Sequence, residues 1–565
     1  MPTIDLIYTE FERMLGLPLN KDLDKINKIL AFAKGEVKLF DEKEDTLSVE
    51  IKDTNRPDIW NIEGLVRTLR GFLNLHEGLI EYKIGKELAE VIVDENLENI
   101  RPYIGCSIVK NVKLTDPIIR GLMQLQDKLD QTYGRNRQRT SIGLYDFNLI
   151  TPPLSYAVAK PTEVSFVPLG FEKEMNLEEI LKEHPKGQEY GFIVDKHPVY
   201  PILLDNKKKV LSFPPIINSN DLGRVTEETK NILVEVTGTN HETVLNALTI
   251  VTLSLIDRGG NAHSATIHYP NTESKIVTPN FQTKLMDLSL SYACNVLGPR
   301  LTARQIAKLL GKAGFGIQGG GNDSLRVQIP CYRIDVMHPI DLVEDIAIAY
   351  DYNKIKPLWR KLPTTGGARK EQALLDVVRE LMVGLGFQEV LTYTLTNLES
   401  LFARMNLKEE KVIEIANPKV QTLSCLRNRL LPSLLEFLSS NLHIEYPQKV
   451  FELNKVTIPD QKKETRARDE ERLAAVTSHA TASFTEIKSA LDALFANLGL
   501  EWNIKDAKHQ SFIEGRVGTA IVDKQEIGVL GELHPKVLES WTLENPVAAF
   551  ELDIEKIIKI KHAKT

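Results

Sequence analysis

The first hundred residues show the spacing of an amphipathic helix between segments that are typical of strands. Within residues 63–75, apolar side chains recur at intervals of three and four residues, which is the period of one helix face. These side chains are Leu65, Val66, Leu69, Phe72 and Leu73. Pro57 and Asp58 stand ahead of the run, and both residue types are favoured in the first turn of a helix. The pattern predicts a helix that begins near Pro57 within a mixed domain.

Residues 100–268 alternate between helical spacing and short β-branched runs. Ile118, Leu122, Leu125 and Leu129 predict one amphipathic helix. The runs that predict strands are 191–195, 200–205, 209–216 and 231–238, and turn residues separate them. A second helix is expected over 241–260, where paired glycines end it. The segment is therefore predicted to be a mixed α/β domain.

Residues 275–355 place a glycine turn between a helix and a strand. Thr302 is a typical N-cap, the helical pattern continues through Leu310, and Gly314 ends it. Residues 325–330 then predict a strand, and an acidic helix follows. This order indicates a helix-turn-helix or winged-helix module, which contacts nucleic acid in some proteins and is only a scaffold in others.

The last segment follows a linker at residues 361–369. Helical patterns at 372–387 and 431–443 alternate with strand patterns at 389–395, 448–456 and 516–522, as in an α+β fold on an antiparallel sheet. The predicted fold class is therefore a multidomain α+β protein. The predicted domains are 1–95, 100–268, 275–355 and 360–565.

Composition narrows the protein class without naming a function. A length of 565 residues predicts several domains, and 42% hydrophobic with 26% charged residues is typical of a soluble globular protein. No apolar run approaches the roughly 18 residues that a membrane span needs, and the N-terminus does not have the pattern of a secretory signal. The four cysteines, Cys106, Cys294, Cys331 and Cys425, form no CxxC pair. A cytoplasmic protein without a cysteine-based zinc site is expected.

The charge pattern argues against a protein whose only role is to bind nucleic acid. The net charge is −7, whereas such proteins are usually basic. One local basic run covers residues 133–140. A solvated loop is the favoured interpretation of that run, and a nucleic-acid contact is the alternative.

Four acids gather in residues 331–350. Pro339 predicts a helix start, which puts Asp341, Glu344 and Asp345 on one face at positions i, i+3 and i+4. Asp335 ends the preceding strand and can fold back toward them. Four converging carboxylates repel one another unless they are neutralised, and a hard cation such as Mg²⁺ would neutralise them. The helix dipole or pairing with Arg333 would explain the acids without a metal.

Other common catalytic motifs are absent from the sequence. It contains no GxxxxGK[ST], HExxH or GxSxG, and the glycines of 311–321 follow a helix instead of a strand. His263 and His268 are possible metal ligands but are more simply ordinary histidines. Composition and periodicity alone therefore do not choose between an enzyme and an assembly subunit.

A set of longer sequence motifs does distinguish between these classes. "TNRPDIWNIEGLVRTL", "SIGLYD", "VLSFPPIINSND", "IPCYRIDVMHPIDLVEDIAIAYDYNKI", "LRNRLLPSLLEFLSSNL", "QKVFELNKV" and "GELHPKVLESW" occur in this order. Together they resemble the phenylalanine–tRNA ligase beta subunit family in its archaeal and eukaryotic form. The resemblance extends from about residue 40 to about residue 555.

The resemblance implies that this chain is one of two kinds of subunit in an enzyme. Two alpha and two beta chains would join phenylalanine to tRNA(Phe) with ATP, through an aminoacyl-adenylate, and the alpha subunit would hold the aminoacylation site. Residues 360–565 would be a degenerate class II domain, because the "QKVFELN" strand lacks the paired arginine and the "FELDIEKI" region lacks the glycines and arginine that hold ATP. The beta chain would act as scaffold, tRNA binder and editing subunit.

The resemblance also implies two sets of site residues. The Mg²⁺ ligands would be Asp335, Asp341, Glu344 and Asp345, with an aspartate at 345 where bacterial relatives often have glutamate. The editing pocket, which would hydrolyse mischarged Tyr-tRNA, falls on Leu204, Ser212, Glu235, Thr237 and Gly238. Editing is needed because an apolar phenylalanine pocket rejects tyrosine only about a hundredfold. Glu235 stands where relatives commonly have aspartate, so its longer side chain is expected to shift the phenol contact.

Two alternatives remain beside this interpretation. One is a nucleic-acid-binding or assembly protein with no enzyme role, and the other is a free-standing deacylase. The N-terminal oligonucleotide-binding insertion and the C-terminal anticodon-binding extension of bacterial beta subunits are not expected in this sequence. Anticodon contact is then expected from the alpha subunit, which fits the net charge of −7.

Overall fold

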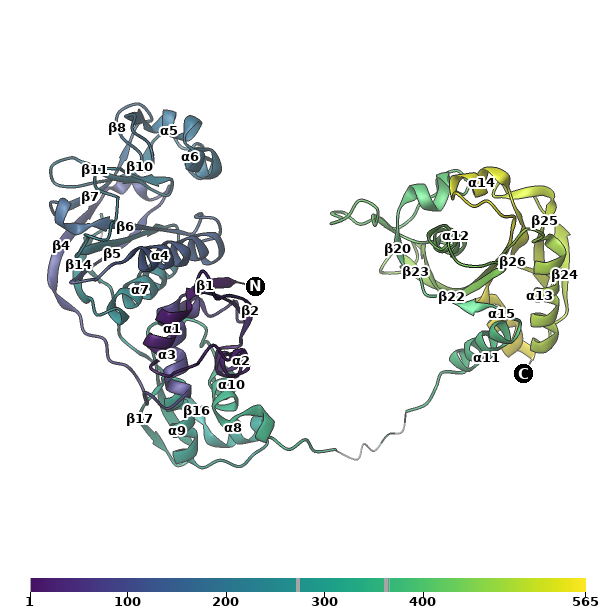
Figure 1. Cartoon of the computed structure of the whole chain (residues 1–565), viewed down its shortest axis with the longest axis horizontal. Helices are drawn as coiled ribbons and strands as arrows, with labels where there is room; N and C mark the ends of the chain where they lie inside the picture. The colour runs from purple at the N-terminus through teal and green to yellow at the C-terminus, as the bar shows by residue number, and fades with distance from the viewer. Residues whose placement is uncertain (1, 271–274, 360–363, 365, 565) are drawn as a thin grey trace. The chain divides into compact units, whose positions relative to one another are not determined.

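The computed structural model describes residues 2–270, 275–359, 364 and 366–564 (Figure 1). The chain divides into two units, Met1–Trp359 and Arg360–Thr565, each of which combines helices with sheets. The protein is therefore a mixed α/β multidomain protein. Within the expected linker, residues 361–363 and 365 lie outside the described residues. The finer division of the first unit into three domains stays a prediction.

A three-stranded antiparallel sheet, in the order β1-β3-β2, begins the first unit. Its strands are β1 (Thr3–Ile7), β2 (Gly35–Asp41) and β3 (Thr46–Ile51), and its helices are α1 (Tyr8–Leu15), α2 (Leu23–Leu30) and α3 (Ile62–Phe72). The helix expected from Pro57 starts later. Pro57 opens a short 3-10 turn, and Asn61 caps α3 by accepting a hydrogen bond from the Gly64 N–H.

The largest sheet has the strand order β12-β11-β10-β7-β4-β14-β5-β13-β6, with β15 beside β14. Its strands are β4 (Gly85–Val93), β5 (Tyr103–Lys110), β6 (Thr140–Asp146), β7 (Leu154–Ala159), β10 (Tyr200–Leu204), β11 (Val210–Phe213), β12 (Ile217–Asn218), β13 (Ile232–Gly238), β14 (Asn261–His268) and β15 (Ile276–Thr278). Arg137, just before β6, donates to the carbonyls of Pro215 and Ile216, just before β12. The sheet therefore curves until its two ends approach each other.

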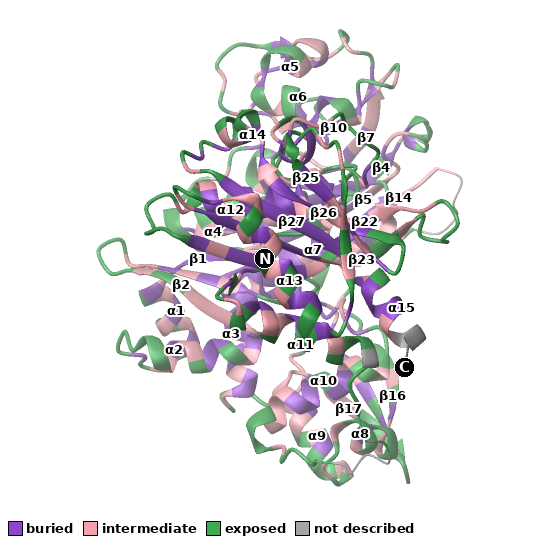
Figure 2. Ribbon diagram, turned by 90° about the vertical axis from the view of Figure 1, so that its right-hand side faces the viewer, coloured by how far each residue is buried: buried purple, intermediate pink, exposed green. Residues whose placement is uncertain are grey.

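Two helices cover one face of this sheet. They are α4 (Asp116–Lys128) and α7 (His241–Asp257), and their apolar residues share a buried cluster with Ile142 and Leu144 of β6 and with Val234 and Val236 of β13. The opposite face buries Cys106, Tyr145 and Leu233. Alternate residues of β6 and β13 thus point to opposite sides, as the strand period requires, and both sides are buried. Figure 2 draws buried residues in purple.

A smaller group of elements lies between β7 and β10. It contains β8 (Ser165–Phe166), β9 (Met175–Asn176), α5 (Leu177–Glu183) and α6 (Pro185–Tyr190). The strand expected at residues 191–195 is wrong, because Gly191–Ile193 form a 3-10 turn directly after α6. The run is too short for its period to decide between strand and helical turn. Burial of Val194 in the local core favours the turn.

Residues 284–350 form a third group around a three-stranded antiparallel sheet in the order β16-β18-β17. Its elements are β16 (Lys284–Ser289), α8 (Leu290–Leu297), α9 (Ala303–Lys312), β17 (Gly316–Gly321), β18 (Ser324–Ile329) and α10 (Pro339–Tyr350). The predicted cap at Thr302 and the predicted helix start at Pro339 are confirmed. Leu342 and Ile346 of α10 pack on Ile306 and Leu310 of α9.

The second unit is built on a seven-stranded sheet in the order β19-β22-β23-β27-β26-β25-β24. Its strands are β19 (Gln388–Glu389), β22 (Gln448–Pro459), β23 (Ala467–Ser478), β24 (Trp502–Asp506), β25 (Phe512–Val522), β26 (Gln525–Leu533) and β27 (Val547–Asp553), beside a separate pair, β20 (Leu395–Thr396) and β21 (Cys425–Leu426). All pairs of the seven-stranded sheet are antiparallel except β19 with β22.

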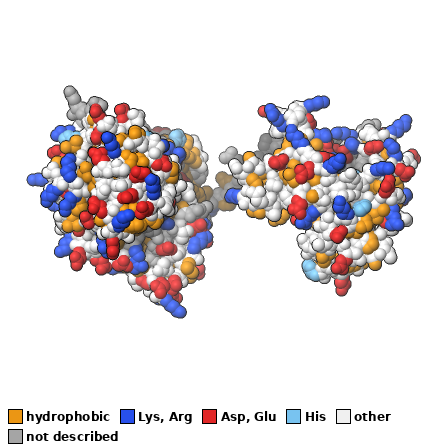
Figure 3. All heavy atoms as spheres, turned by 90° about the horizontal axis from the view of Figure 1, so that it is seen from above, with side chains coloured by type: hydrophobic (Ala, Val, Ile, Leu, Met, Phe, Trp, Pro, Cys, Tyr) orange, Lys and Arg blue, Asp and Glu red, His pale blue; other side chains and the backbone are white. Residues whose placement is uncertain are grey.

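Helices cover both faces of that sheet. One core contains residues of α11 (Lys370–Gly384), α13 (Phe484–Leu498) and α15 (Ile554–Lys564), and the other contains residues of α12 (Leu431–Ser440) and α14 (Pro535–Ser540). The continuous strand expected over 389–395 is broken, because only its two ends pair. On the faces visible in Figure 3, acidic and basic side chains are interspersed over both units. Within the part of the chain that the structure describes, no helix has the length and hydropathy of a membrane span.

Candidate functional site

A cavity of about 310 Å³ lies where the two ends of the large sheet approach each other. Two of the predicted editing residues, Ser212 on β11 and Glu235 on β13, line it. Most of its wall is apolar. The apolar residues are Ile119, Met123, Ile142, Leu144, Leu169, Phe213, Pro214, Pro215, Ile216, Ile217 and Val225. A cavity of this size with a few convergent polar groups is typical of a small-ligand site.

Glu235 is the buried acid of this cavity, with only 3% of its surface exposed. Its Oε2 accepts a hydrogen bond of 2.9 Å from the Tyr145 hydroxyl, while its Oε1 has no hydrogen-bond partner among the described residues. Burial raises the pKa of Glu235 to about 7, against the Tyr145 hydrogen bond, the charge of Arg101 and the neighbouring Thr237 hydroxyl. A buried carboxylate oxygen without a partner is expensive, so its presence beside a cavity indicates a place for a ligand.

Thr237 and Gly238 lie behind the cavity instead of on its wall. The Thr237 side chain is buried and accepts a hydrogen bond from Nε of Arg101, which also donates to the Thr237 carbonyl. A Cβ on Gly238 would stand 2.2 Å from the Arg139 carbonyl oxygen, so only glycine allows the close approach of backbone here. These two residues set the position of the strand that carries Glu235.

Leu204 is not among the described residues that line the cavity. It is the last residue of β10, half-buried against a different apolar cluster that includes Tyr200 and Ile202. Its neighbour Leu203 is the residue opposite Ser212 across β10 and β11. A shift of one residue along a strand reverses the face of the side chain, so this assignment depends on register.

Sequence reasoning missed several polar groups of the cavity. Arg137, Lys186, Asn218 and Arg224 also line it. Arg137 belongs to the basic run expected to be a solvated loop, and for Arg137 that expectation is wrong. Its side chain is buried, it lies 3.1 Å from the Asp130 carboxylate, and it donates to two backbone carbonyls. Those acceptors are far away in the sequence, so no local pattern revealed them.

The predicted metal ligands have other partners in this structure. Arg333 donates to Asp335 at 2.7 Å and to Asp345 at 2.6 Å, and Arg56 lies 3.7 Å from Asp335. Burial raises the pKa of Asp335, but Arg333 and Arg56 outweigh it and hold that pKa below its ordinary value. For Asp345, burial outweighs Arg333, and the pKa is raised.

The other two acids of the set point to different donors. Asp341 accepts hydrogen bonds from the backbone N–H groups of Met337 and His338, so it belongs to the N-terminal cap of α10. Glu344 is exposed and forms a 2.6 Å ion pair with Lys34. Among the described residues, no three His, Cys, Asp or Glu side chains are grouped so as to hold a metal ion.

Carboxylates suit Mg²⁺ chemically, but in this arrangement cations and backbone donors already neutralise them. The folded set therefore does not fit a metal unless Arg333 or Lys34 is displaced, and the Mg²⁺ site stays a prediction. His263 and His268 are separately engaged, with the Lys86 carbonyl at 3.0 Å and with Glu90 at 3.2 Å.

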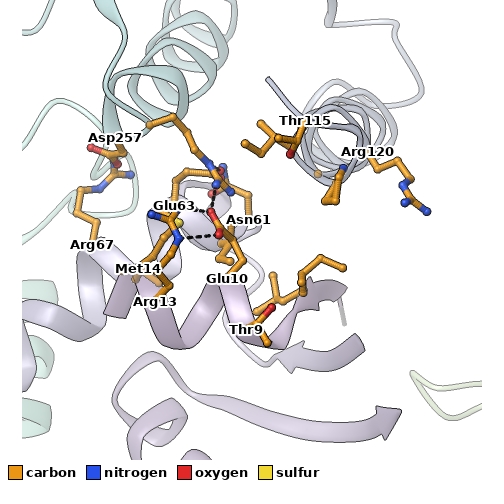
Figure 4. A pocket seen from close by; sticks show the side chains of 18 of the residues that line it. Thr9, Glu10, Arg13, Met14, Asn61, Glu63, Arg67, Thr115, Arg120 and Asp257 are labelled. Atoms are coloured by element: carbon orange, nitrogen blue, oxygen red, sulfur yellow. Dashed lines mark hydrogen bonds and ion pairs between the residues drawn. The ribbon is translucent and has the colours of Figure 1, made fainter. Parts of the chain in front are cut away.

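A larger cavity of about 1000 Å³ lies between α1, α3 and α4 (Figure 4). None of the predicted site residues lines it. The buried charges that line it are paired, since Arg258 contacts Glu10 and Glu63, and Arg67 lies 2.6 Å from Asp257. The smaller cavity is the better functional candidate despite its size, because two of the predicted editing residues, Ser212 and Glu235, line it.

Comparison with known proteins identifies the family. The family model described as "tRNA synthetase B5 domain" matches residues 286–352, and the one described as "Phenylalanyl tRNA synthetase beta chain CLM domain" matches residues 355–554. The phenylalanine–tRNA ligase beta subunit of Pyrococcus furiosus is 41% identical over 99% of this chain and 100% of its own length. The chain belongs to the phenylalanine–tRNA ligase beta subunit family.

Further members of this beta subunit family match the chain with similar identity and coverage. The beta subunit of Thermococcus kodakarensis is 42% identical over 98% of both chains, and that of Archaeoglobus fulgidus is 38% identical over 98% of both. A crystal structure of an N-terminal fragment of the Pyrococcus horikoshii beta subunit matches 62% of this chain and 99% of the fragment, with a TM-score of 0.60 and 37% identity. The predicted family is thereby confirmed.

Proposed function

We propose that this chain is the beta subunit of an active phenylalanine–tRNA ligase. Together with an alpha subunit it attaches phenylalanine to tRNA(Phe), using ATP, through Phe-AMP, with release of AMP and diphosphate. The observation that carries the proposal is the match of relatives with this name over nearly the whole chain. The beta subunit name implies an alpha partner, and the proposed assembly contains two chains of each kind.

The second unit is the proposed scaffold for the alpha subunit, a degenerate class II domain that does not activate ATP itself. ATP binding requires cations that are free to contact phosphate. Arg427, fully buried in this unit, is instead paired with Glu452 at 2.8 Å, and Arg472 is paired with Glu470. The internal pairing supports a structural role for these arginines.

The 310 Å³ cavity is the proposed editing site, which hydrolyses Tyr-tRNA(Phe). Its apolar wall suits an aromatic ring, and Ser212 and Glu235 stand where a phenol hydroxyl can reach them. Lys186 and Arg224 line the same cavity and would attract the phosphates of the tRNA end. Thr237 and Gly238 hold the strand, and Leu204 acts only through its neighbours.

The winged-helix-like module at residues 275–355 is the proposed tRNA-contacting part, because it contains the match to the tRNA synthetase B5 domain. Mg²⁺ at Asp335, Asp341, Glu344 and Asp345 would have to displace Arg333 and Lys34. No step of the proposed function depends on that metal. A cytoplasmic location is part of the same proposal.

The test uses the full chain alone and in complex with its alpha subunit. The complex should aminoacylate tRNA(Phe) and hydrolyse Tyr-tRNA(Phe), while the chain alone should not exchange pyrophosphate into ATP. Amino-acid-dependent exchange by the chain alone would contradict the scaffold role of the second unit. Deacylation by the chain alone, with no alpha subunit captured on purification, would favour the free-standing deacylase. Intact Tyr-tRNA in the active complex would contradict editing.

A further inference from the structure

Polar side chains from four strands, β6, β11, β12 and β13, meet at the floor of the 310 Å³ cavity. The Tyr145 hydroxyl, on β6, lies 2.9 Å from Glu235 Oε2, on β13, and 2.9 Å from Ser212 Oγ, on β11. It also lies 3.3 Å from Asn218 Oδ1. Tyr145 is completely buried and is not among the described residues that line the cavity, whereas Ser212 and Glu235 line it. Tyr145 therefore contacts three wall residues, Ser212, Asn218 and Glu235, from behind.

The direction of these hydrogen bonds follows from which of the groups carries a proton to donate. Burial, with the Glu235 charge, raises the pKa of Tyr145 well above its ordinary value, so the phenol keeps its one proton. A carboxylate is a stronger acceptor than a hydroxyl, so Tyr145 donates to Glu235. The Ser212 hydroxyl then donates its own proton to the Tyr145 oxygen. When Glu235 is ionised, above its pKa of about 7, Glu235 Oε1 and the Ser212 lone pairs remain for the cavity, and both are acceptors.

We infer that Tyr145 is a positioning residue that leaves Glu235 Oε1 and Ser212 Oγ as acceptors toward this cavity, so that the cavity selects an aminoacyl side chain that carries a hydroxyl. The inference rests on the proposed editing function. A tyrosyl side chain donates its phenol proton to this floor. A phenylalanyl side chain has no proton to donate and leaves both acceptors unpaired, which is the kind of penalty that gives strong discrimination.

The backbone is built to allow the contact. Gly143 stands opposite Glu235 across β6 and β13. A Cβ on Gly143 would lie 2.3 Å from the Tyr145 hydroxyl oxygen and 2.6 Å from Glu235 Oε2. Any side chain at position 143 would therefore push Tyr145 and Glu235 apart, and glycine is required by the hydrogen bond itself.

Several titratable or polar groups besides Tyr145 lie around Glu235. They are Thr237 on its own strand, Cys106 on β5, Tyr156 on β7, Arg101 ahead of β5, and the cavity residues Arg137, Lys186 and Arg224. Burial keeps Cys106 and Tyr156 neutral, because it raises the pKa of both. The Arg101 guanidinium donates hydrogen bonds to Thr237, to Ser141 and to a backbone carbonyl. Tyr145 is thus the group that bonds directly to Oε2.

The test compares the wild-type complex with Tyr145→Phe, measuring hydrolysis of Tyr-tRNA(Phe) and of Phe-tRNA(Phe) between pH 5.5 and 8.5. Loss of one charge-assisted hydrogen bond should lower the ratio of the two rates about tenfold. Because the Tyr145 hydrogen bond lowers the pKa of Glu235, its removal should also move the midpoint of the pH profile upward. Gly143→Ala should shift ratio and midpoint in the same directions.

Tyr269→Phe is the matched control. It removes a tyrosine hydroxyl that bonds to the Ile104 backbone in the same sheet, outside the cavity lining. Tyr269→Phe should leave the ratio of the two hydrolysis rates and the midpoint of the pH profile unchanged. A wild-type complex that does not hydrolyse Tyr-tRNA(Phe) overturns the editing function and this inference with it. A wild-type complex that edits, beside a folded Tyr145→Phe with the same ratio and the same midpoint, overturns only the role of Tyr145.

Discussion

Glu235 and the pair Asp335 and Asp345 are buried carboxylates with opposite surroundings. Asp335 and Asp345 share Arg333, at 2.7 and 2.6 Å. Glu235 lies at a cavity and has a neutral donor on one oxygen, while the other oxygen has no hydrogen-bond partner in the described part of the chain. Burying charge is costly unless it is paired. The acids near α10 therefore join parts of the fold, whereas Glu235 keeps an unmet bond that a ligand can satisfy.

The partners of the two sites differ in sequence distance as well. Arg56 and Lys34, which approach Asp335 and Glu344, come from the N-terminal part of the first unit. These ion pairs link the small sheet at the N-terminus to α10. Glu235 instead depends on strands of one sheet. The clustered acids are thus paired with cations or backbone donors, whereas Glu235 Oε1 has no hydrogen-bond partner among the described residues.

The largest expected effect comes from removing the shared cation. Arg333→Met should destabilise the first unit by about 3–5 kcal/mol, because it leaves two buried carboxylates without their main partner. Urea unfolding followed by fluorescence measures this change. Arg326→Met, which breaks the exposed pair with Asp287, is the control and should leave the midpoint unchanged. Equal midpoints for both variants would show that Arg333 does not neutralise the pair.

The pH dependence of unfolding should separate the two sites. The pKa of Glu235 is about 7 in the folded chain, against an ordinary value of 4.5. Between these values the folded chain holds a proton that the unfolded chain has lost. The free energy of unfolding should therefore fall as pH rises through this range, by on the order of 3 kcal/mol.

For Asp335 the sign is reversed. Its pKa is held below the ordinary 3.8, so its contribution to the free energy of unfolding is present above that value and disappears as pH falls through the folded pKa.

To test the Glu235 prediction, the unfolding of wild type and of Glu235→Gln should be compared between pH 4.5 and 8. The variant should lose less stability over this range than the wild type, and Asp130, whose pKa burial also raises to about 7, contributes equally to both. Parallel curves would mean that Glu235 ionises normally.

Glu235→Gln should also weaken editing. It removes the charge from the acceptor that faces the cavity, and hydrogen bonds to charged groups contribute about 1.5–3 kcal/mol. Hydrolysis of Tyr-tRNA(Phe) by the complex should fall roughly tenfold to a hundredfold. Aminoacylation with phenylalanine by the same preparation should not change, since that site is proposed in the alpha subunit. An equal loss of both activities would indicate general damage to the complex.

The smallest effect is expected at the exposed edge of the acidic cluster. Glu344→Gln breaks a partly exposed ion pair with Lys34, and such pairs contribute about 0–1 kcal/mol. Thermal melting with EDTA should show almost no change. The same melt with added Mg²⁺ examines the predicted metal: a rise in Tm that Glu344→Gln abolishes would place the cation at these carboxylates, at the expense of the Lys34 pair.

Local features of the fold could be derived from the sequence. The cap at Thr302 and the helix start at Pro339 are confirmed, because a cap depends on residues within one turn. The placement of Asp341, Glu344 and Asp345 on one helix follows from the same short range. The ordered phrases were enough to predict the family, which the relatives confirm. Glu235 and Ser212 were reached through that resemblance and lie on one cavity.

Only the tertiary structure decided what these residues contact. Lys34 meets Glu344 across 310 positions, and Tyr145 meets Glu235 across 90. Such contacts depend on strand order and on which face each side chain takes, and a one-residue change of register reverses that face. The sequence alone therefore determined most of the elements, though not those at 191–195 and 389–395, and which acids stand near one another along the chain. The fold determined which of those acids are neutralised and which one is left with a bond to make.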